Sequence, residues 1–162
     1  LYSSAASDVY KRQIYNSPAN MFVADFMGSP AMNLLTATVS GSPGALKLEL
    51  AQREGAPLVI PLHDEKLASR LGQTVIFGIR PEAITDPEGA DRLSRHLVEA
   101  GCMIEVVEPA GADTFAITHL GGKETVARLR ADTKTAAGHV SRLAFNLDRA
   151  VFFDPKTEML IR

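Results

Sequence analysis

Two hydrophobic periodicities divide the chain near residue 30. Before it, apolar residues recur at the spacing of one helical face, at Phe22, Val23, Phe26 and Met27. Ser17 and Pro18 offer a helix start, because serine caps a first turn and proline is tolerated at the first helical position. Gly28 and Pro30 predict the end of the helix. Few partners lie nearby, so we expect this apolar face to be poorly buried.

After residue 33 the chain alternates in the manner of β-strands. Leucines at 46, 48 and 50 alternate with polar residues, which is the pattern of a half-buried strand. Similar reasoning predicts strands at 34–39, 46–50, 58–62, 74–80, 97–107, 114–119, 124–129, 142–147 and 150–153. Short strands at regular spacing, with turn signals between them, predict a closed or nearly closed small barrel, because closure removes exposed edges.

Turn and breaker residues set the predicted boundaries. Pro61 is tolerated only near the edge of a sheet or the end of a strand, and Pro81 stops the strand before it. Residues 64–71 predict one helical turn, whereas 84–95 is polar and predicts an exposed loop. We expect turns at 41–44, 109–112 and 154–157, and a tight hairpin at Gly121-Gly122.

The first thirteen residues, LYSSAASDVYKRQ, look foreign to the rest of the chain. The segment from Asp8 to Gln13 resembles the in-frame translation of a transposase adaptor end used in sequencing libraries. We therefore interpret residues 1–13 as a non-native, adaptor-derived tail and leave them out of the fold prediction. A natural flexible tail is the alternative. On the first interpretation the natural protein extends further upstream, and this chain is a C-terminal piece of it.

The composition is that of an ordinary globular protein. The 162 residues suffice for one domain, or for one domain with a fragment of another, and 46% hydrophobic against 22% charged residues provides for a packed core. The net charge of −2 and the isoelectric point near 6.1 give no general attraction to nucleic acid or anionic lipid. No apolar run approaches the ~20 residues that span a bilayer, and no signal peptide is visible, so we expect a cytoplasmic protein.

No arrangement of residues predicts catalysis. A phosphate-binding P-loop needs two glycines at fixed spacing before Lys-Ser or Lys-Thr, but Gly122-Lys123 is followed by Glu124 and predicts a hairpin turn. The histidines lack the spacing of metal ligands; they are His63, His96, His119 and His139. The single cysteine, Cys102, lies in an apolar run and is interpreted as a small buried hydrophobe. We therefore assign no catalytic, cofactor-binding or metal-ligating residue.

A small β-barrel can also bind oligonucleotides, using a basic groove lined with stacking aromatic side chains. Here aromatic residues make up 6% of the chain, tryptophan is absent, and the basic residues are scattered among acidic ones. We therefore expect no nucleic-acid partner, and we keep oligonucleotide binding only as the least favoured alternative.

Three groups of motifs, in order along the chain, resemble one family. They are Pro18-Ala19-Asn20 with the run from Phe22 to Asn33; Gly78-Ile79-Arg80-Pro81-Glu82; and Val107-Glu108-Pro109 with Gly111-Ala112-Asp113-Thr114 and Phe153-Asp154. Together they resemble the ATP-binding proteins of sugar-importing ABC transporters, at the junction where the nucleotide-binding domain ends and the regulatory TOBE domain begins. The resemblance covers residues 14–162. The closing turn departs from the family, because Glu158 follows Thr157 where glycine is usual.

This resemblance implies an OB-like β-barrel, the TOBE domain, over residues 30–162, preceded at 14–29 by one short α-helix left over from a missing ATPase domain. It implies a regulatory and dimerisation domain, whose parent is an ABC-type ATPase of the maltose or glycerol-3-phosphate type. The parent binds ATP and Mg²⁺ through motifs absent here, so we expect no enzymatic activity of this fragment. The implied partners are a second copy of the subunit and, through the ATPase domain, membrane permease subunits at the cytoplasmic face of the cell membrane.

The same resemblance names candidate residues. The family-motif residues, which are candidates for an interface, are Gly78, Arg80, Pro81, Glu82, Gly111, Asp113, Phe153 and Asp154. The residues of the domain junction are Phe22, Phe26, Gly28, Pro30 and Asn33. For Arg80 and Glu82 we favour a structural role, as a charge pair that fixes the end of one strand, over a contact with a partner subunit or the ATPase domain. A different hypothesis, drawn from the TOBE domains of oxyanion transporters, is a barrel that binds a small molybdate-like anion.

Overall fold

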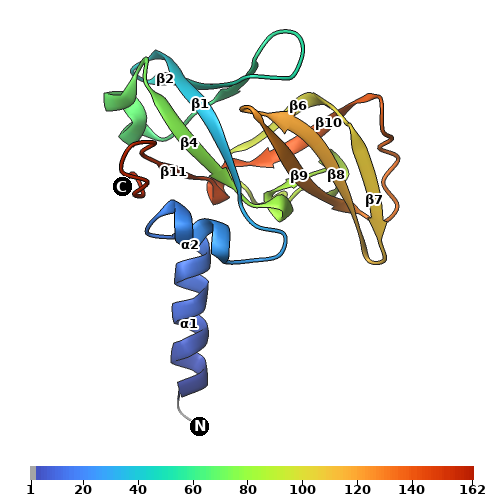
Figure 1. Ribbon diagram of the computed structural model, residues 1–162, viewed down its shortest axis with the longest axis horizontal. Coiled ribbons are helices and arrows are strands. Elements are labelled where there is room, and N and C mark those ends of the chain that lie inside the picture. Colours follow the sequence, from blue (N-terminus) through green and yellow to red (C-terminus); the bar gives the residue numbers. More distant parts are fainter. Residues whose placement is uncertain (1–2) are drawn as a thin grey trace.

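The β-strands form one body, and two helices precede it. A computed structural model describes residues 3–162, in which helix α1 spans Ser3–Asn16 and helix α2 spans Met21–Phe26. The strands are β1 (Asn33–Ser42), β2 (Ala45–Leu50), β3 (Leu58–Pro61), β4 (Thr74–Ile79), β5 (Ile84–Thr85), β6 (Leu97–Met103), β7 (Val106–Ala110), β8 (Asp113–Leu120), β9 (Lys123–Arg130), β10 (Val140–Asn146) and β11 (Val151–Phe153). Figure 1 shows α1 extending away from the strands. Neither helix of the described residues has the length and apolarity needed to cross a membrane.

The strands form three antiparallel sheets. The five-stranded sheet has the order β11-β4-β1-β2-β3. Two three-stranded sheets, β5-β10-β6 and β7-β8-β9, lie beside it, at the right of Figure 1. The predicted fold class, mainly β with an OB-like barrel, is confirmed, and two helices precede the strands where one short helix is predicted. We call the body of three sheets the barrel.

One hydrophobic core joins the three sheets. Phe77 comes from the five-stranded sheet, Phe145 from β5-β10-β6 and Ala116 from β7-β8-β9, and all three are fully buried in the same cluster. In β2 the burial alternates as predicted, with the leucines inside and Lys47 outside. Burying a side chain of the size of phenylalanine contributes ~1.5–3 kcal/mol. This shared core therefore holds the three sheets together as one unit.

The helix before the barrel begins later than the sequence predicts. Asn20 caps α2, because its Oδ1 accepts a hydrogen bond of 2.9 Å from the backbone N–H of Val23. Ser17-Pro18 lies between the two helices instead, and Asn20 forms a β-bridge with Met159. Asparagine caps as well as serine, and the bridge holds the preceding segment in extended conformation. Residues 3–16 form α1, which includes much of the tail that the fold prediction left out; the origin of residues 1–13 stays a prediction.

The predicted strand 97–107 is two strands, β6 and β7. The first part, β6, pairs with β10 as far as Met103, and just beyond both strands the N–H of Ile104 donates to His139 O at 3.0 Å. The second part pairs with β8 from Glu105, whose N–H donates to Ile117 O at 2.8 Å. A change of partner strand leaves no mark in an alternating apolar pattern, so the sequence predicts one strand where there are two.

The segment 84–95 is not the fully exposed loop that its polarity predicts. Ile84 belongs to β5, pairs with β10 and is fully buried. Asp86 is also buried, and its carboxylate lies 3.4 Å from Nε of Arg130. A buried carboxylate needs such a partner. Because Arg130 is 44 residues further along the chain, local polarity alone assigns Asp86 wrongly to the surface.

The turns fall close to their predicted places. Gly121-Gly122 joins β8 to β9 with φ angles of 58° and 77°. The connection between β7 and β8 is shorter than predicted, because Ala110 pairs with Asp113. Pro61 ends β3, an edge strand of the five-stranded sheet, as its missing N–H requires. In the closing turn, Glu158 adopts a φ of 61°, a conformation that suits the glycine usual in the family.

The side chain of Asn33 links the five-stranded sheet to the β7-β8-β9 sheet. Its Nδ2 donates to Val126 O, and its Oδ1 accepts from Val126 N–H, both at 2.9 Å. Asn33 is buried, and the oxygen and the nitrogen of its side-chain amide both have a hydrogen-bond partner inside the protein. This predicted junction residue therefore acts as a backbone-like connection between two sheets.

Candidate functional site

The sequence at the end of β4 sets the conformation of Arg80. A proline restricts the residue before it to extended backbone, and Arg80, before Pro81, has φ −79° and ψ 152°. Arg80 is only 3% exposed. A buried guanidinium without acceptors is costly, so the donors of Arg80 must find partners in the protein.

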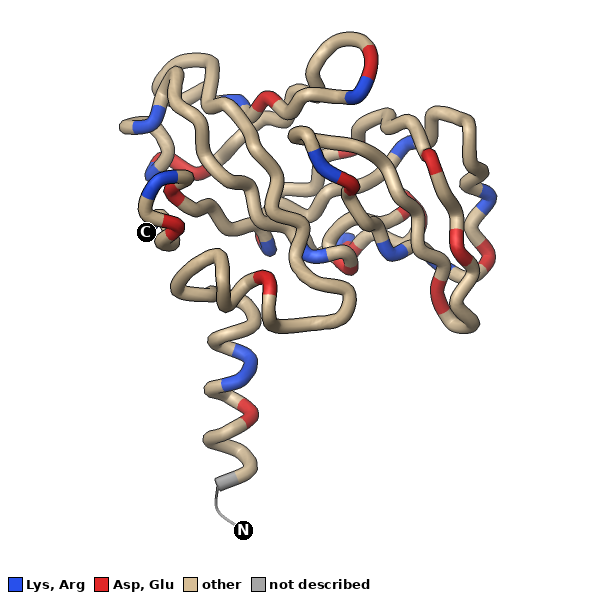
Figure 2. Tube along the Cα trace, in the orientation of Figure 1, with Lys and Arg blue, Asp and Glu red and all other residues tan. Residues whose placement is uncertain are grey.

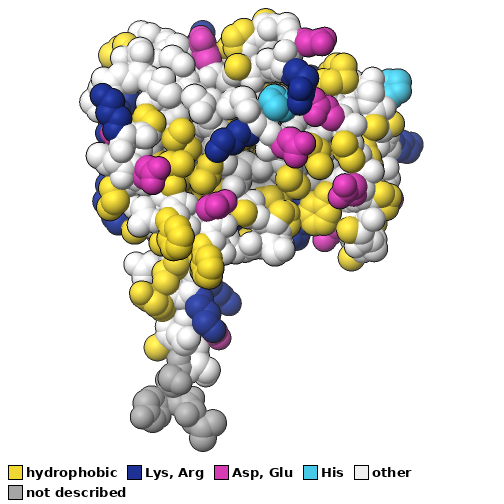
Figure 3. All heavy atoms as spheres, in the orientation of Figure 1, with side chains coloured by type: hydrophobic (Ala, Val, Ile, Leu, Met, Phe, Trp, Pro, Cys, Tyr) yellow, Lys and Arg dark blue, Asp and Glu magenta, His cyan; other side chains and the backbone are white. Residues whose placement is uncertain are grey.

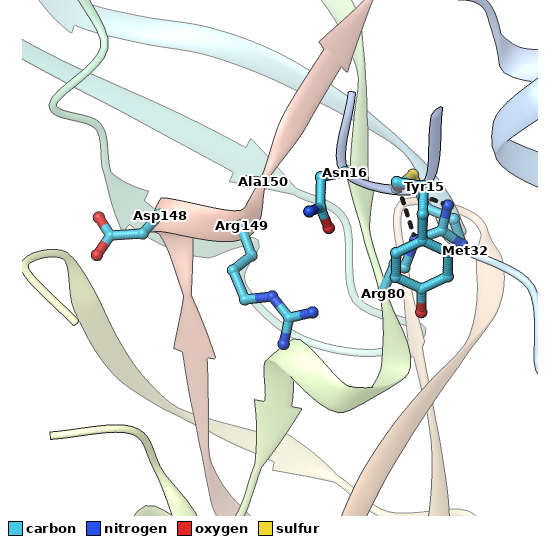
Figure 4. A pocket seen from close by; sticks show the side chains of 7 residues that line it. All are labelled: Tyr15, Asn16, Met32, Arg80, Asp148, Arg149 and Ala150. Atoms are coloured by element: carbon cyan, nitrogen blue, oxygen red, sulfur yellow. Dashed lines mark hydrogen bonds between the residues drawn. The ribbon is translucent and has the colours of Figure 1, made fainter. Parts of the chain in front are cut away.

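Arg80 finds these partners on the helical segment. Its Nη2 and Nε donate to the backbone carbonyl of Tyr15 at 2.9 and 3.3 Å, and its Nη1 donates to Met27 O at 2.5 Å. The guanidinium also lies over the Tyr15 ring, 3.6 Å from the ring centroid, as Figure 4 shows. Contacts of this kind contribute ~0.5–2 kcal/mol. One side chain thus holds both the last turn of α1 and the end of α2 to β4.

Glu82 and Arg149 complete the arrangement. The Tyr15 hydroxyl donates to Oε1 of Glu82, which lies 3.6 Å from Nη2 of Arg149. Burial, together with the hydrogen bond and charge of Glu82, raises the pKa of Tyr15, and burial lowers the pKa of Arg80. The predicted charge pair between Arg80 and Glu82 is wrong, because each of them contacts Tyr15 instead. We call Tyr15, Arg80, Glu82 and Arg149 the Arg80 cluster.

Two glycines make room for this packing. Gly28 has a φ of 103°, and a Cβ there would lie 3.1 Å from Nη1 of Arg80. A Cβ at Gly78 would lie 2.8 Å from Sδ of Met32 and 2.9 Å from Cγ2 of Val151. Contacts below about 3.0 Å force neighbouring atoms to move, so a larger residue at 78 would push apart the small core beneath α2.

A hollow of about 360 Å³ opens beside the Arg80 cluster. It is lined by Tyr15, Asn16, Met32, Arg80, Asp148, Arg149 and Ala150. The Asp148 carboxylate accepts from Arg95 N–H at 2.7 Å and pairs with Nδ1 of His96 at 2.8 Å, and these contacts lower the pKa of Asp148. Within residues 3–162, no three His, Cys, Asp or Glu side chains gather in a way that could hold a metal ion. The arrangement is suited to holding the helical segment against the barrel.

The outer face of α2 is apolar and uncovered. Phe22 is 74% exposed and Phe26 is 75% exposed, so the expected poor burial of this face is confirmed for both rings, whereas Val23 is half-buried. The two rings stack on one another with centroids 6.1 Å apart. Ala24, on the other side of the helix, is fully buried against Met32 and its neighbours. Figure 3 shows hydrophobic side chains gathered where the helical segment meets the strand body.

The structure brings several predicted residues together at this place. Gly78, Arg80, Pro81 and Glu82 lie around the end of β4, and Gly28 joins them through its contact with Arg80. Phe153 is fully buried in the small core beneath α2. The peptide bond between Ser29 and the junction residue Pro30 is cis.

Other predicted residues lie elsewhere. Gly111 and Asp113 are at the turn between β7 and β8, where Asp113 lies 3.7 Å from Arg128. Asp154 accepts from Nη1 of Arg70 at 2.5 Å, and its Oδ1 also caps the backbone N–H groups of the closing turn. These contacts, with Arg70 first, lower the pKa of Asp154 to about 2. The three motif groups therefore do not form one continuous site.

Sequence reasoning missed Tyr15 and Arg149. Tyr15 lies just after the excluded tail and shows no periodic partner, although it belongs to the segment that resembles the family junction. Arg149 lies in the single turn between β10 and β11, where a basic residue predicts only a solvated surface. For Tyr15 itself, the one available signal is its position directly after Ile14, where the resemblance begins.

Comparison with known proteins finds similarity to one domain family and to several longer proteins. The family model of the MalK OB fold domain matches residues 28–84. The ABC transporter ATP-binding protein YcjV of Escherichia coli O157:H7 is 36% identical over 155 residues, which are 93% of this chain and 39% of that protein. YurJ of Bacillus subtilis, another ABC transporter ATP-binding protein, is 36% identical over 151 residues, 90% of this chain and 39% of that protein.

A further relative has a named solute. The sn-glycerol-3-phosphate import ATP-binding protein UgpC of Cupriavidus necator is 32% identical over 146 residues, covering 90% of this chain and 38% of that protein. The chain thus spans about 39% of the length of the curated relatives it matches. Among solved structures, a cytoplasmic molybdate-binding protein, ModG, superposes with a TM-score of 0.49 at 18% identity, over 76% of this chain and 96% of that one. A likeness of that extent says nothing about a ligand of this chain.

Proposed function

We propose that this chain is the regulatory and dimerisation domain of an ABC transporter ATP-binding subunit; the match of residues 28–84 to the MalK OB fold domain and the similarity to YcjV and YurJ support this. The parent subunit couples ATP hydrolysis to the import of carbohydrates or related solutes. The UgpC relative, named for glycerol-3-phosphate import, supports a solute of this kind.

In this proposal the chemistry belongs to the nucleotide-binding part of the parent. ATP and Mg²⁺ are held there, and this chain contributes neither a P-loop nor a catalytic residue. Its partners are a second copy of the subunit and, through the ATPase domain, the membrane permease subunits. The working place is the cytoplasmic face of the membrane.

The observation that carries the proposal is the uncovered face of Phe22 and Phe26. Helix α2 carries this face. Arg80 binds the end of α2 and the buried Ala24 packs its inner side on the barrel, so the orientation of the outer face is fixed. Two stacked rings three-quarters exposed to water are unfavourable, and burying each is worth ~1.5–3 kcal/mol. A nucleotide-binding domain packed on this face accounts for them.

The reading frame upstream of Ile14 provides the first test. We expect it to encode a Gly-x-x-x-x-Gly-Lys-Ser/Thr loop and, after it, the signature loop of transport ATPases. A natural upstream sequence without these two motifs would overturn the proposal. ATP hydrolysis by the purified 162-residue chain would overturn it as well.

The Phe26→Ser substitution provides the second test. In this chain it should leave the melting temperature within about 1 °C, because Phe26 is 75% exposed. In the complete subunit it should lower the melting temperature by roughly 2–4 °C or more, since there the ring is buried. Leu93→Ser is the matched control, because Leu93 is 92% exposed on a loop and should be neutral in both proteins. If Phe26→Ser is neutral in both as well, the ATPase domain does not pack on this face.

A further inference from the structure

A second hollow lies apart from the Arg80 cluster. It has a volume of about 710 Å³ and runs between the segment 51–57, which joins β2 to β3, and the neighbouring parts of β6, β8 and β10. Its lining consists of Gln52, Arg53, Glu54, Gly55, Ala56, Pro57, Gly101, Met103, Glu105, Thr118, His119 and Val140. This volume lies within the range of ~300–1,000 Å³ that small-molecule sites occupy. We call it the loop groove.

The wall formed by segment 51–57 is fixed in place. At its base, Gly121 N–H donates to Ala51 O at 2.8 Å, and Gln52 forms a β-bridge with Leu120. Within the segment, Nε2 of Gln52 donates to Ala56 O at 2.9 Å. Figure 1 shows this segment arching beyond the strands, and Figure 2 shows a basic and an acidic residue side by side on it. The groove is therefore held open by the fold itself.

Three polar side chains from three elements meet in the loop groove. Nε of Arg53 donates to Oε1 of Glu105 at 2.6 Å, and Nη2 of Arg53 donates to Nδ1 of His119 at 3.0 Å. With Nδ1 accepting, the hydrogen of a neutral His119 is on Nε2. Nη1 of Arg53 and Oε2 of Glu105 have no hydrogen-bond partner among residues 3–162. The trio thus offers donors and an acceptor to an occupant.

The charges and apolar groups of the groove narrow the class of occupant. The groove is lined by one arginine, Arg53, and by two carboxylates, Glu54 and Glu105. Their summed charge is negative, so an anion would be repelled. A simple cation cannot accept a hydrogen bond, so it would leave Nη1 of Arg53 without an acceptor. Met103 and Val140 line the same groove, 48% and 66% exposed, and present apolar surface. Hydroxyl groups both donate and accept, and C–H faces match apolar side chains.

We propose that the loop groove binds a neutral polyhydroxylated molecule, a saccharide or a polyol. Its hydroxyl groups contact Arg53, Glu105 and His119, and its C–H face lies on Met103 and Val140. The proposal does not depend on the transport role of the parent subunit, since it rests only on groups within this chain. An oxyanion site requires a cationic lining, and the loop groove does not have one.

Amide NMR titration of the 162-residue chain tests the proposal. The probes are maltose for saccharides, sorbitol for polyols and sodium molybdate for oxyanions. We expect maltose or sorbitol to cause saturable shifts confined to residues 51–57 and to the amides of Met103, His119 and Val140, with a Kd in the millimolar range of ~1–10 mM. The probe that binds more tightly distinguishes the two hydroxylated classes.

A pair of variants tests the role of the polar trio. Arg53→Ala should weaken binding at least about tenfold, whereas Arg92→Ala, which removes an exposed arginine outside the groove, should leave it unchanged. Arg53 has a side chain 58% exposed, so its loss should leave the spectrum well dispersed. The absence of saturable shifts with either hydroxylated probe up to about 50 mM, or tighter binding of molybdate, would overturn the proposal. Equal affinities of the two variants would overturn the assigned role of Arg53.

Discussion

Only an arginine can make the contacts seen at position 80. A guanidinium donates to several acceptors in one plane and stacks on an aromatic ring, which a lysine ammonium cannot do at once. Arg80 donates to the carbonyls of Tyr15 and Met27 while it lies over the Tyr15 ring. A helix as short as α2 is not stable by itself, and the contacts of the Arg80 side chain stabilise it against the barrel.

The Arg80 contacts predict a graded series of stabilities. Arg80→Ala and Arg80→Lys should each lower the free energy of unfolding by ~1–3 kcal/mol, because the half-buried carbonyls of Tyr15 and Met27 lose their donors. Arg149→Ala should lower it by less than about 0.5 kcal/mol, since that side chain is 44% exposed and its ion pair spans 3.6 Å. Urea unfolding followed by circular dichroism measures the three values. Equal losses in all three variants would contradict the central role of Arg80.

Asp154 predicts a defined acid limit of stability. Its pKa in the folded protein is about 2, lowered first by Arg70 and then by the backbone N–H groups of Thr157 and Lys156, against about 3.9 when unfolded. A lowered folded pKa stabilises the protein above the unfolded pKa, and this contribution is lost as the pH falls through the folded value. Between about pH 4 and pH 2, the melting temperatures of the protein and of Asp154→Asn should therefore converge. Arg70→Ala should show the same convergence, and a gap that does not shrink between about pH 4 and pH 2 would refute the assignment.

At the scale of elements, the hairpin between β8 and β9 locks two sheets together. Both glycines of its turn have positive φ, so alanine at either position costs ~1–2 kcal/mol of backbone strain. A Cβ at Gly121 would also lie 2.6 Å from Thr36 O, whereas nothing lies within 4 Å of a Cβ at Gly122. Of the two turn glycines, Gly121 is thus the one packed against β1.

The two glycines provide a matched pair of substitutions. Gly122→Ala should lower the free energy of unfolding by ~1–2 kcal/mol through strain alone. Gly121→Ala should lower it by at least roughly 1–3 kcal/mol more, because β1 must move away from the hairpin. Chemical denaturation of both variants measures the difference. If the two variants lose the same free energy of unfolding, the close approach of residue 121 to Thr36 does not contribute to the cost of the substitution.

The elements that depend on local chemistry could be predicted from the sequence. Alternating leucines in β2, Pro61 at a strand end and Gly121-Gly122 in a hairpin each act within a few residues. The division of 97–107 into β6 and β7 could not, because it is decided by the partner strands: Met103 pairs with Val140 of β10, whereas Val106 pairs with Ile117 of β8. Local sequence specifies a conformation; it does not specify which strand provides the partner.

In the candidate site, too, features set by local sequence could be predicted, whereas contacts made across the fold could not. Arg80 and Glu82 could be singled out because they stand in a recognisable motif, and the exposure of Phe22 and Phe26 followed from a face without partners. Tyr15, which gives Arg80 and Glu82 their contacts, is 65 residues from Arg80, and no local pattern connects them. The expected ion pair was therefore assigned between neighbours in the sequence, whereas the contacts are made across the fold.

At the scale of the whole molecule, three sheets share one core and should unfold as one. The core cluster contains residues of every sheet, and Asn33 joins two of them with paired hydrogen bonds to Val126. Circular dichroism and amide NMR should give coincident thermal transitions. Asn33→Ala should lower the free energy of unfolding by ~1–3 kcal/mol and keep a single transition. Two separated transitions in the unsubstituted protein would contradict a common core.

The β-bridge between Asn20 and Met159 has a consequence for the order of events on the ribosome. Met21 N–H donates to Glu158 O, and Leu160 N–H donates to Ala19 O, both at 3.0 Å. Residues 158–160 are synthesised after every strand of the barrel, because chains emerge with the N-terminal part first. The connection between α1 and α2 therefore stays open during translation and closes last. Whatever precedes it folds without this contact, and the barrel is fixed to the helical segment through this bridge only after residues 158–160 have been synthesised.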